Sequence, residues 1–158
     1  MIYRARRNNA CESNMMNSLV QYVHNHSIIR EIENMGIPKP KHILVVDDDP
    51  VIREILIVFL NVMGFEVESF DNGADALEAF KVNNFKMVLT DIQMPIVDGW
   101  ELISGIKKMS PETPVILITG MEKHIVEEGM KHGRANSVLF KPFKLGDLKK
   151  MVDSFLTS

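Results

Sequence analysis

The sequence is nearly free of cysteine and has no long apolar run, and these absences exclude several classes of protein. Cys11 is the single cysteine, so no disulfide forms within the chain, and a reducing compartment is indicated. No stretch approaches the roughly 20 apolar residues that span a bilayer. The basic start of the chain is followed by polar residues instead of the apolar centre of a signal peptide. We therefore expect a cytoplasmic protein that does not enter a membrane.

Neither sign of charge dominates the whole chain. The formal net charge of −3 gives no reason to expect direct binding of nucleic acid. The hydrophobic fraction of 46% and the charged fraction of 25% are typical of a globular protein with a buried core. The charge is unevenly distributed: residues 1–41 hold six Lys/Arg and three Asp/Glu, a net of +3, so residues 42–158 carry −6.

A linker is predicted where the charge changes. The segment from Gly36 to Pro40 contains two prolines and a glycine, which suit neither a helix interior nor a central strand. We therefore expect an N-terminal extension at residues 1–40 and a domain at residues 41–158. Apolar residues between Asn14 and Met35 have helical spacing, but the periodicity falters at Asn25. The extension is a candidate for docking on the domain, for dimerisation or for partner binding, and the alternatives are disorder or an upstream start codon.

Short apolar runs alternate with helix-like segments throughout residues 41–158. The predicted strands are Ile43–Val46, Phe65–Phe70, Met87–Thr90, Val115–Ile118 and Val138–Phe140, and the predicted helices are Val51–Met63, Ala74–Val82, Trp100–Met109, His124–Lys131 and Gly146–Phe155. Alternation of this kind predicts an α/β fold, in which helices cover both faces of a parallel sheet. Glu66 and Glu68 lie on one face of the second run, as expected of an edge strand.

Polar residues follow four of the predicted strands, at the edge where open α/β sheets bind ligands. They are Asp47, Asp48 and Asp49 after the first strand, Asp91 after the third, Thr119 after the fourth and Lys141 after the fifth. Converging carboxylates repel one another unless a cation shares the site. Oxygen ligands without clustered Cys or His favour a hard ion. Asp47, Asp48 and Asp91 are therefore a candidate Mg²⁺ pocket.

The same residue types suit phosphoryl transfer. A carboxylate is a competent nucleophile that becomes an acyl phosphate. A bound Mg²⁺ neutralises the oxygens of the incoming phosphoryl group, a lysine pairs with them and a threonine hydroxyl donates a hydrogen bond. The acidic residues together with Thr119 and Lys141 are therefore a complete set for phosphorylation of an aspartate.

Several motifs, taken jointly and in order, resemble those of the receiver domains of two-component response regulators. The motifs are LVVDDDP at Leu44–Pro50, LTDIQMP at Leu89–Pro95, Asp98-Gly99, ITG at Ile118–Gly120 and KPF at Lys141–Phe143. The resemblance covers about residues 41–158. It implies a five-stranded, doubly wound, flavodoxin-like sheet with strand order 2-1-3-4-5. It also implies a phosphoacceptor that assists its own phosphorylation and dephosphorylation, and not an enzyme.

The resemblance assigns roles to individual acidic residues. It implies that Asp91 is the phosphoacceptor and that Asp47 and Asp48 hold Mg²⁺ together with Asp91. Gln93 matches the position that contributes its backbone carbonyl to the metal, so its side-chain type matters little there.

Further implications concern the phosphoryl group, the partners and the output. The hydroxyl and the lysine that contact the phosphoryl group match Thr119 and Lys141. The implied cofactor is Mg²⁺, and the implied donor is a sensor histidine kinase or a histidine phosphotransfer protein. The chain ends at Ser158, directly after the last predicted helix. We therefore expect a single-domain regulator, a monomer or weak dimer, that signals through partner binding or passes the phosphoryl group on.

The sequence departs from the family pattern in two places. Three residues before Lys141, where the family usually has a Tyr or Phe switch residue, stands Val138, and Phe140 lies two residues on, closer to the site. One residue is also inserted between Gly133 and Ala135. Both departures lie near the usual output face, so we expect an unconventional conformational response.

Two other functions are open at the level of the sequence. A receiver fold can serve as a docking module without being phosphorylated. An apolar strand followed by Asp47-Asp48-Asp49 also satisfies the start of haloacid-dehalogenase-like phosphatases, with Asp47 as nucleophile, although the chain lacks their longer core and further acidic pairs. Asp49, followed by Pro50, is also typical of a helix start, as is Asp98.

Overall fold

The computed structural model of the chain describes residues 41–132 and 135–156. In these residues five parallel strands form one sheet, in the order β2-β1-β3-β4-β5 that was predicted. The strands are β1 (His42–Val46), β2 (Glu66–Phe70), β3 (Met87–Thr90), β4 (Val115–Thr119) and β5 (Ser137–Phe140). The helical pattern between Asn14 and Met35 and the insertion between Gly133 and Ala135 fall on residues outside this description.

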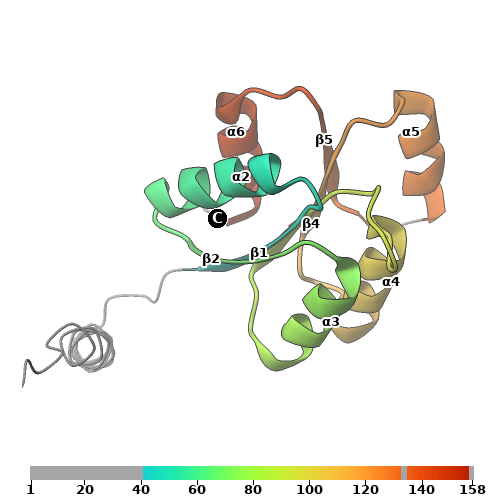
Figure 1. The fold of residues 1–158 in the computed structure, drawn as a ribbon, viewed down its shortest axis with the longest axis horizontal. Helices are drawn as coiled ribbons and strands as arrows, with labels where there is room; N and C mark the ends of the chain where they lie inside the picture. The colour runs from blue at the N-terminus through green and yellow to red at the C-terminus, as the bar shows by residue number, and fades with distance from the viewer. Residues whose placement is uncertain (1–40, 133–134, 157–158) are drawn as a thin grey trace, which may run out of the picture. The chain divides into compact units, whose positions relative to one another are not determined.

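Helices cover both faces of the sheet (Figure 1). In the described chain they are α2 (Pro50–Val62), α3 (Gly73–Val82), α4 (Gly99–Met109), α5 (Lys123–His132) and α6 (Leu145–Leu156). Helices α2 and α6 pack on one face, and α3, α4 and α5 pack on the other. The predicted strands and helices are confirmed, each with ends within one residue of those predicted. None of these helices combines the length and the apolar content that a membrane span requires.

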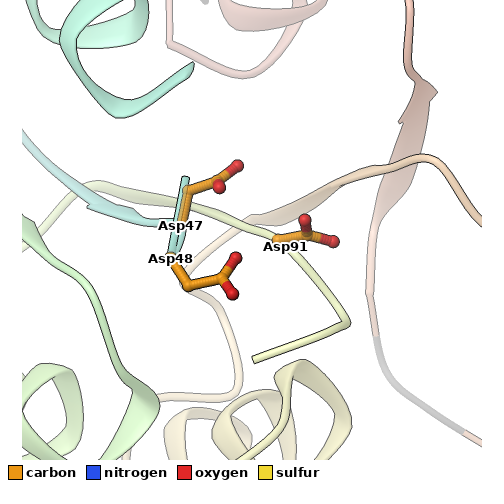
Figure 2. A group of neighbouring side chains, drawn as sticks. All are labelled: Asp47, Asp48 and Asp91. Atoms are coloured by element: carbon orange, nitrogen blue, oxygen red, sulfur yellow. The ribbon is translucent and has the colours of Figure 1, made fainter. Parts of the chain in front are cut away.

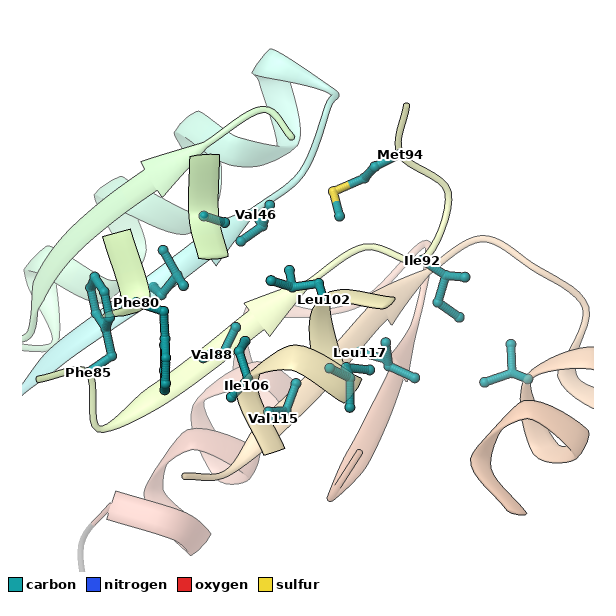
Figure 3. Packing of buried hydrophobic residues seen from close by; sticks show 14 residues of the cluster. Val46, Phe80, Phe85, Val88, Ile92, Met94, Leu102, Ile106, Val115 and Leu117 are labelled. Carbon is teal, nitrogen blue, oxygen red and sulfur yellow. The ribbon is translucent and has the colours of Figure 1, made fainter. Parts of the chain in front are cut away.

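The central strands are buried on both faces because successive side chains point to opposite sides of the sheet. In β1, Leu44 and Val46 face α3, α4 and α5, whereas Ile43 and Val45 face α2 and α6. Figure 3 shows the first of these two clusters, in which aromatic and aliphatic side chains of the helices meet valine and leucine side chains of the strands. Burial of each large aliphatic side chain contributes about 2 kcal/mol. Apolar packing therefore holds the sheet on both faces.

The edge position predicted for the second strand is confirmed. Strand β2 lies at one end of the sheet and pairs with β1 in parallel. Glu66 is exposed, and no residue of β2 is fully buried, in contrast to every residue of β3 and β4. The alternating charges therefore lie on an edge strand that the helices cover only in part.

The helix starts predicted at Asp49 and Asp98 are also confirmed. The Asp49 carboxylate accepts the N–H of Val51 at 2.8 Å, and Pro50 occupies the first helical position. The Asp98 carboxylate accepts the N–H of Glu101 at 2.9 Å, and the Glu101 carboxylate accepts the N–H of Asp98 at 3.4 Å. Such caps contribute about 1 kcal/mol each. They set the direction in which the chain leaves the carboxyl ends of β1 and β3.

A buried cation, Lys107, organises the opposite edge of the sheet. Its ammonium donates to the carbonyl oxygens of Pro111 at 3.0 Å and Thr113 at 2.7 Å, and to the side-chain oxygen of Asn136 at 2.9 Å. The same Asn136 oxygen accepts the N–H of Val115 at 2.9 Å. Lys107 lies in the last turn of α4, where its charge also interacts favourably with the helix dipole. It thereby ties α4 to the segments that enter β4 and β5.

We expect Lys107→Met to lower the free energy of unfolding by about 2 kcal/mol, because buried carbonyl oxygens lose a charged donor. Urea denaturation measures this as a lower midpoint with an unchanged slope. Lys108→Met is the matched control, since Lys108 is exposed on the same helix turn. Equal midpoints for the two variants would show that the Lys107 contacts do not stabilise the fold.

Candidate functional site

The structure brings three acidic residues together at the carboxyl ends of β1 and β3 (Figure 2). One carboxylate oxygen each from Asp47, Asp48 and Asp91 lies within 4.8 Å of the others. Asp47 and Asp48 directly follow β1, and Asp91 follows β3, the neighbour of β1 in the sheet. Asp47 and Asp91 are buried, whereas Asp48 is exposed. The group therefore forms a pocket of oxygen ligands that solvent reaches from one side.

Lys141 connects the two buried carboxylates. Its ammonium donates to Oδ2 of Asp91 at 2.7 Å and to Oδ2 of Asp47 at 2.9 Å. Lys141 directly follows β5, so its side chain reaches across the end of β4 to the ends of β3 and β1. The Lys141 side chain is 20% exposed. One ammonium group thus donates to the carboxylate that follows β1 and to the carboxylate that follows β3.

Burial and charge shift the pKa of Asp47 and of Lys141. Burial raises the pKa of Asp47 above the usual aspartate value, although hydrogen bonds from Lys141 and from the N–H of Asp49 offset part of this effect. Burial also lowers the pKa of Lys141, but hydrogen bonds and charges from Asp91 and Asp47 outweigh it, and the net pKa is raised. Lys141 is therefore a cation throughout the physiological range. The acidic group holds three carboxyl groups and Lys141 contacts two of them, an arrangement that favours a further cation.

Backbone groups hold the Asp91 carboxylate in place. Its Oδ1 accepts the N–H of Ile92 at 2.5 Å and the N–H of Gln93 at 3.3 Å, and Lys141 binds the other oxygen. The start of α4 packs directly on this backbone, because a Cβ at Gly99 would lie 2.2 Å from the Asp91 carbonyl oxygen. Glycine at this position is what permits the close approach.

Trp100 continues the contact from the start of α4 to α5. A Cβ at Gly129 would lie 2.3 Å from Cζ2 of Trp100, so the indole lies directly against the α5 backbone. Trp100 is half-buried and packs on the cluster shared by α3, α4 and α5. The role that these contacts support for Trp100 is packing. Through Gly99 and Trp100, α4 connects the backbone of Asp91 to α5.

The structure places Thr119 and Gln93 beside the acidic group. Thr119 ends β4 and is fully buried, and its hydroxyl oxygen accepts the N–H of Met121 at 3.2 Å. Its carbonyl oxygen accepts the N–H of Lys141 at 2.7 Å, which holds the ends of β4 and β5 together. The Gln93 side chain is exposed, while its backbone N–H faces Asp91. All of the predicted site residues therefore stand at one edge of the sheet.

The register of β5 explains the relation between Val138 and Phe140. Val138 pairs with Leu117, and Phe140 pairs with Thr119. Paired residues of neighbouring strands share a face of the sheet, so the Phe140 ring lies on the same face as Thr119 and next to it. Both β5 residues pack on the cluster of α3, α4 and α5. The Phe140 ring therefore lies beside Thr119 at the end of the strand, whereas Val138 lies two residues farther from the site.

The comparisons with known proteins agree with this arrangement. Residues 43–153 match the family model of the response regulator receiver domain. The chain belongs to the receiver-domain family of response regulators. Membership in this family removes the support for a haloacid-dehalogenase-like phosphatase with Asp47 as nucleophile. It also places the chain within two-component signalling.

The relatives include receiver proteins of similar length and much larger proteins. The chain is 36% identical over 116 residues to the response regulator receiver protein CpdR of Brucella abortus, which covers 73% of the chain and 97% of CpdR. It is 33% identical over 114 residues to the autoinducer 1 sensor kinase/phosphatase LuxN of Vibrio harveyi. That match covers 72% of the chain but only 13% of LuxN, so the receiver domain corresponds to a small part of that protein.

The receiver fold is also found among solved structures. The response regulator protein TrrA of Thermotoga maritima, crystallised in complex with Mg²⁺–BeF, is 34% identical to the chain with a TM-score of 0.67. The match covers 73% of the chain and 99% of TrrA. The five-stranded parallel sheet described above is therefore the fold of this family.

One contact at the site was missed by the sequence analysis. The Nη1 group of Arg53 donates to the backbone carbonyl oxygen of Asp47 at 2.5 Å. Arg53 lies in the first turn of α2, and its own N–H donates to the carbonyl oxygen of Asp49 at 3.0 Å. Helical side chains lean toward the helix N-terminus, so a cation at this position reaches back to the acidic loop. The position of Arg53 in the first turn of the predicted helix was therefore the signal from which this contact could have been predicted.

We expect Asp48→Asn to raise the melting temperature of the metal-free receiver domain by about 3 °C, because it removes about 1 kcal/mol of repulsion between neighbouring carboxylates. Thermal unfolding in EDTA measures the shift, which shrinks in 1 M salt as the repulsion is screened. The control is Glu112→Gln, which removes an exposed acid at the opposite edge of the sheet. A decrease in melting temperature for Asp48→Asn would contradict this account of the site.

Proposed function

We propose that this receiver domain accepts a phosphoryl group on Asp91 and binds Mg²⁺ through Asp47, Asp48, Asp91 and the backbone carbonyl of Gln93. The observation that carries the proposal is the acidic group itself, with an ammonium 2.7 Å from Asp91. An oxygen-only set of ligands that is open to solvent suits Mg²⁺, which keeps several waters beside one or two carboxylates. The Mg²⁺–BeF complex of TrrA supports the same choice of metal.

The proposed reaction transfers a phosphoryl group from a phosphohistidine. A carboxylate oxygen of Asp91 attacks the phosphorus, the bond from phosphorus to the histidine nitrogen breaks, and its electron pair stays on that nitrogen. Mg²⁺ neutralises the phosphoryl oxygens when it is bound. Lys141 already contacts Asp91 and is placed to pair with one phosphoryl oxygen, and the Thr119 hydroxyl is the candidate donor to another. The backbone N–H groups that bind Oδ1 keep the carboxylate in orientation.

We propose that the protein is a phosphoacceptor that assists its own phosphorylation and dephosphorylation, without the turnover of an enzyme. We propose a single-domain regulator, with residues 1–40 as an extension and residues 41–158 as the receiver domain, that signals by binding a partner or by passing the phosphoryl group on. The length of CpdR, almost all of which the chain covers, supports a single-domain arrangement. A docking module without phosphorylation is the second candidate, and the first experiment below separates the two.

An exposed apolar stripe supports a protein donor. Val51, Ile55, Val58 and Val62 of α2 are all exposed, at helical spacing along one side of the helix. The stripe starts next to the acidic loop, and Ile96, in the connection that follows Asp91, is exposed as well. A donor whose phosphohistidine reaches Asp91 must cover this edge of the sheet. We propose that a sensor histidine kinase or a histidine phosphotransfer protein binds along the stripe while it delivers the phosphoryl group.

We expect the protein to gain the mass of one phosphoryl group when it is incubated with Mg²⁺ and acetyl phosphate. Asp91→Asn reduces the gain to background, because an amide oxygen does not form the acyl phosphate, and EDTA does the same for the wild type. Intact mass spectrometry measures both effects. Asp71→Asn, at an exposed aspartate, is the matched control and keeps the full gain. If the wild type gains no mass, the docking module without phosphorylation is favoured. If the gain persists in Asp91→Asn, another residue is the acceptor.

We expect Val58→Gln to slow phosphoryl transfer from a protein donor about tenfold, because it removes an apolar contact at the interface. Transfer from each member of a panel of purified, phosphorylated histidine kinases and phosphotransfer proteins is the measurement. The rate of labelling by acetyl phosphate stays unchanged, since no docking is needed. Val82→Gln, at an exposed valine of α3, is the matched control. Equal effects of the two variants on protein donors would exclude docking on the stripe.

A further inference from the structure

Arg53 contacts the loop that carries the acidic pair, and the proposed reaction gives it no role. Its Nη1 group donates to the carbonyl oxygen of Asp47 at 2.5 Å. This carbonyl belongs to the peptide that joins Asp47 to Asp48. Arg53 is half-buried, and its planar guanidinium presents several donors in a fixed geometry. The contact therefore fixes the orientation of the peptide on which Asp48 is carried.

The three carboxylates of the site differ in how they are held. That of Asp47 is bound by the N–H of Asp49 at 2.9 Å and by Lys141. That of Asp91 is bound by two backbone N–H groups and by Lys141. Within residues 41–132 and 135–156, no hydrogen bond or ion pair holds the carboxylate of Asp48, which is exposed. Its position depends on the backbone, and Arg53 fixes the preceding carbonyl.

We propose that Arg53 is a positioning residue for the metal site, which directs the Asp48 carboxylate toward Asp91 by holding the Asp47–Asp48 peptide. The inference rests on the proposed function, since it concerns the same Mg²⁺ pocket. A ligand that must be ordered when the metal binds lowers the affinity by the entropy of that ordering. Outer contacts that hold metal ligands are typically worth ten- to a hundredfold in affinity.

Positioning and simple electrostatics predict opposite results when the guanidinium is removed. A cation beside the pocket repels Mg²⁺, so loss of the charge alone strengthens metal binding. Loss of the hydrogen bond to Asp47 frees the Asp48 carboxylate and weakens metal binding. The direction of the change in Mg²⁺ affinity therefore separates the two roles of Arg53.

The test is isothermal titration calorimetry of the full chain with MgCl₂ alone. Arg53→Met keeps a straight apolar side chain in α2 but removes the donor, and we expect it to raise the Mg²⁺ dissociation constant about tenfold. In an Asp48→Asn background, the same substitution changes the dissociation constant less than about twofold, because the ligand that it positions is already lost. Arg53→Gln, whose amide is too short to replace the guanidinium, serves as a second variant with the same expectation.

Lys108→Met is the control for loss of a distant surface cation, and it leaves the Mg²⁺ dissociation constant unchanged. Far-UV circular dichroism in EDTA shows which of the two variants, Arg53→Met or Arg53→Gln, is folded, and that variant is used for the comparison. Unchanged or tighter Mg²⁺ binding by the Arg53 variant overturns the positioning role and leaves the chemistry of Asp91 intact. A tenfold loss that persists in the Asp48→Asn background also overturns it. A wild type that binds no Mg²⁺ overturns the proposed function together with this inference.

Discussion

Mutual repulsion among three carboxyl groups, confined to one edge of the sheet, is the constraint on which the site depends. At the ends of β1 and β3, one oxygen of each carboxyl group lies within 4.8 Å of the others, and apolar side chains pack on both faces of the sheet that carries them. Lys141 relieves only part of the repulsion, and burial still raises the pKa of Asp47. A fold without function would gain by losing one of these acids. Three acids in this arrangement favour a site for a cation.

The two edges of the sheet serve different purposes. At the carboxyl edge, charged groups are incompletely compensated and one of them, Asp48, faces solvent. At the amino edge, the buried ammonium of Lys107 is matched by carbonyl and amide oxygens. The apolar packing of β3 and β4 lies between the two. The polar groups at one edge are thus satisfied by the fold itself, whereas the carboxylates at the other edge are compensated only in part.

Much of this structure follows from local signals in the sequence. The apolar runs and the caps at Asp49 and Asp98 give the ends of strands and helices, and parallel strands necessarily bring Asp47 and Asp91 to one edge. The contact of Arg53 was missed because its partner is a backbone carbonyl, which leaves no mark in residue type, and only the position of this cation in the first turn of α2 indicates that it reaches the acidic loop. The three acceptors of Lys107 and the α2 stripe were missed for a related reason. Both depend on tertiary packing, which decides whether a side chain is buried or exposed.

The contact between Trp100 and Gly129 has a practical consequence. Trp100 is the only tryptophan of the chain, and it adjoins Gly99, which packs against the backbone of Asp91. Its indole lies against a second helix, α5, so its emission depends on how those two helices meet. The protein therefore carries a native optical reporter at the first packing contact beyond the site. An event at Asp91 that moves α4 against α5 would therefore change the emission of the unlabelled protein.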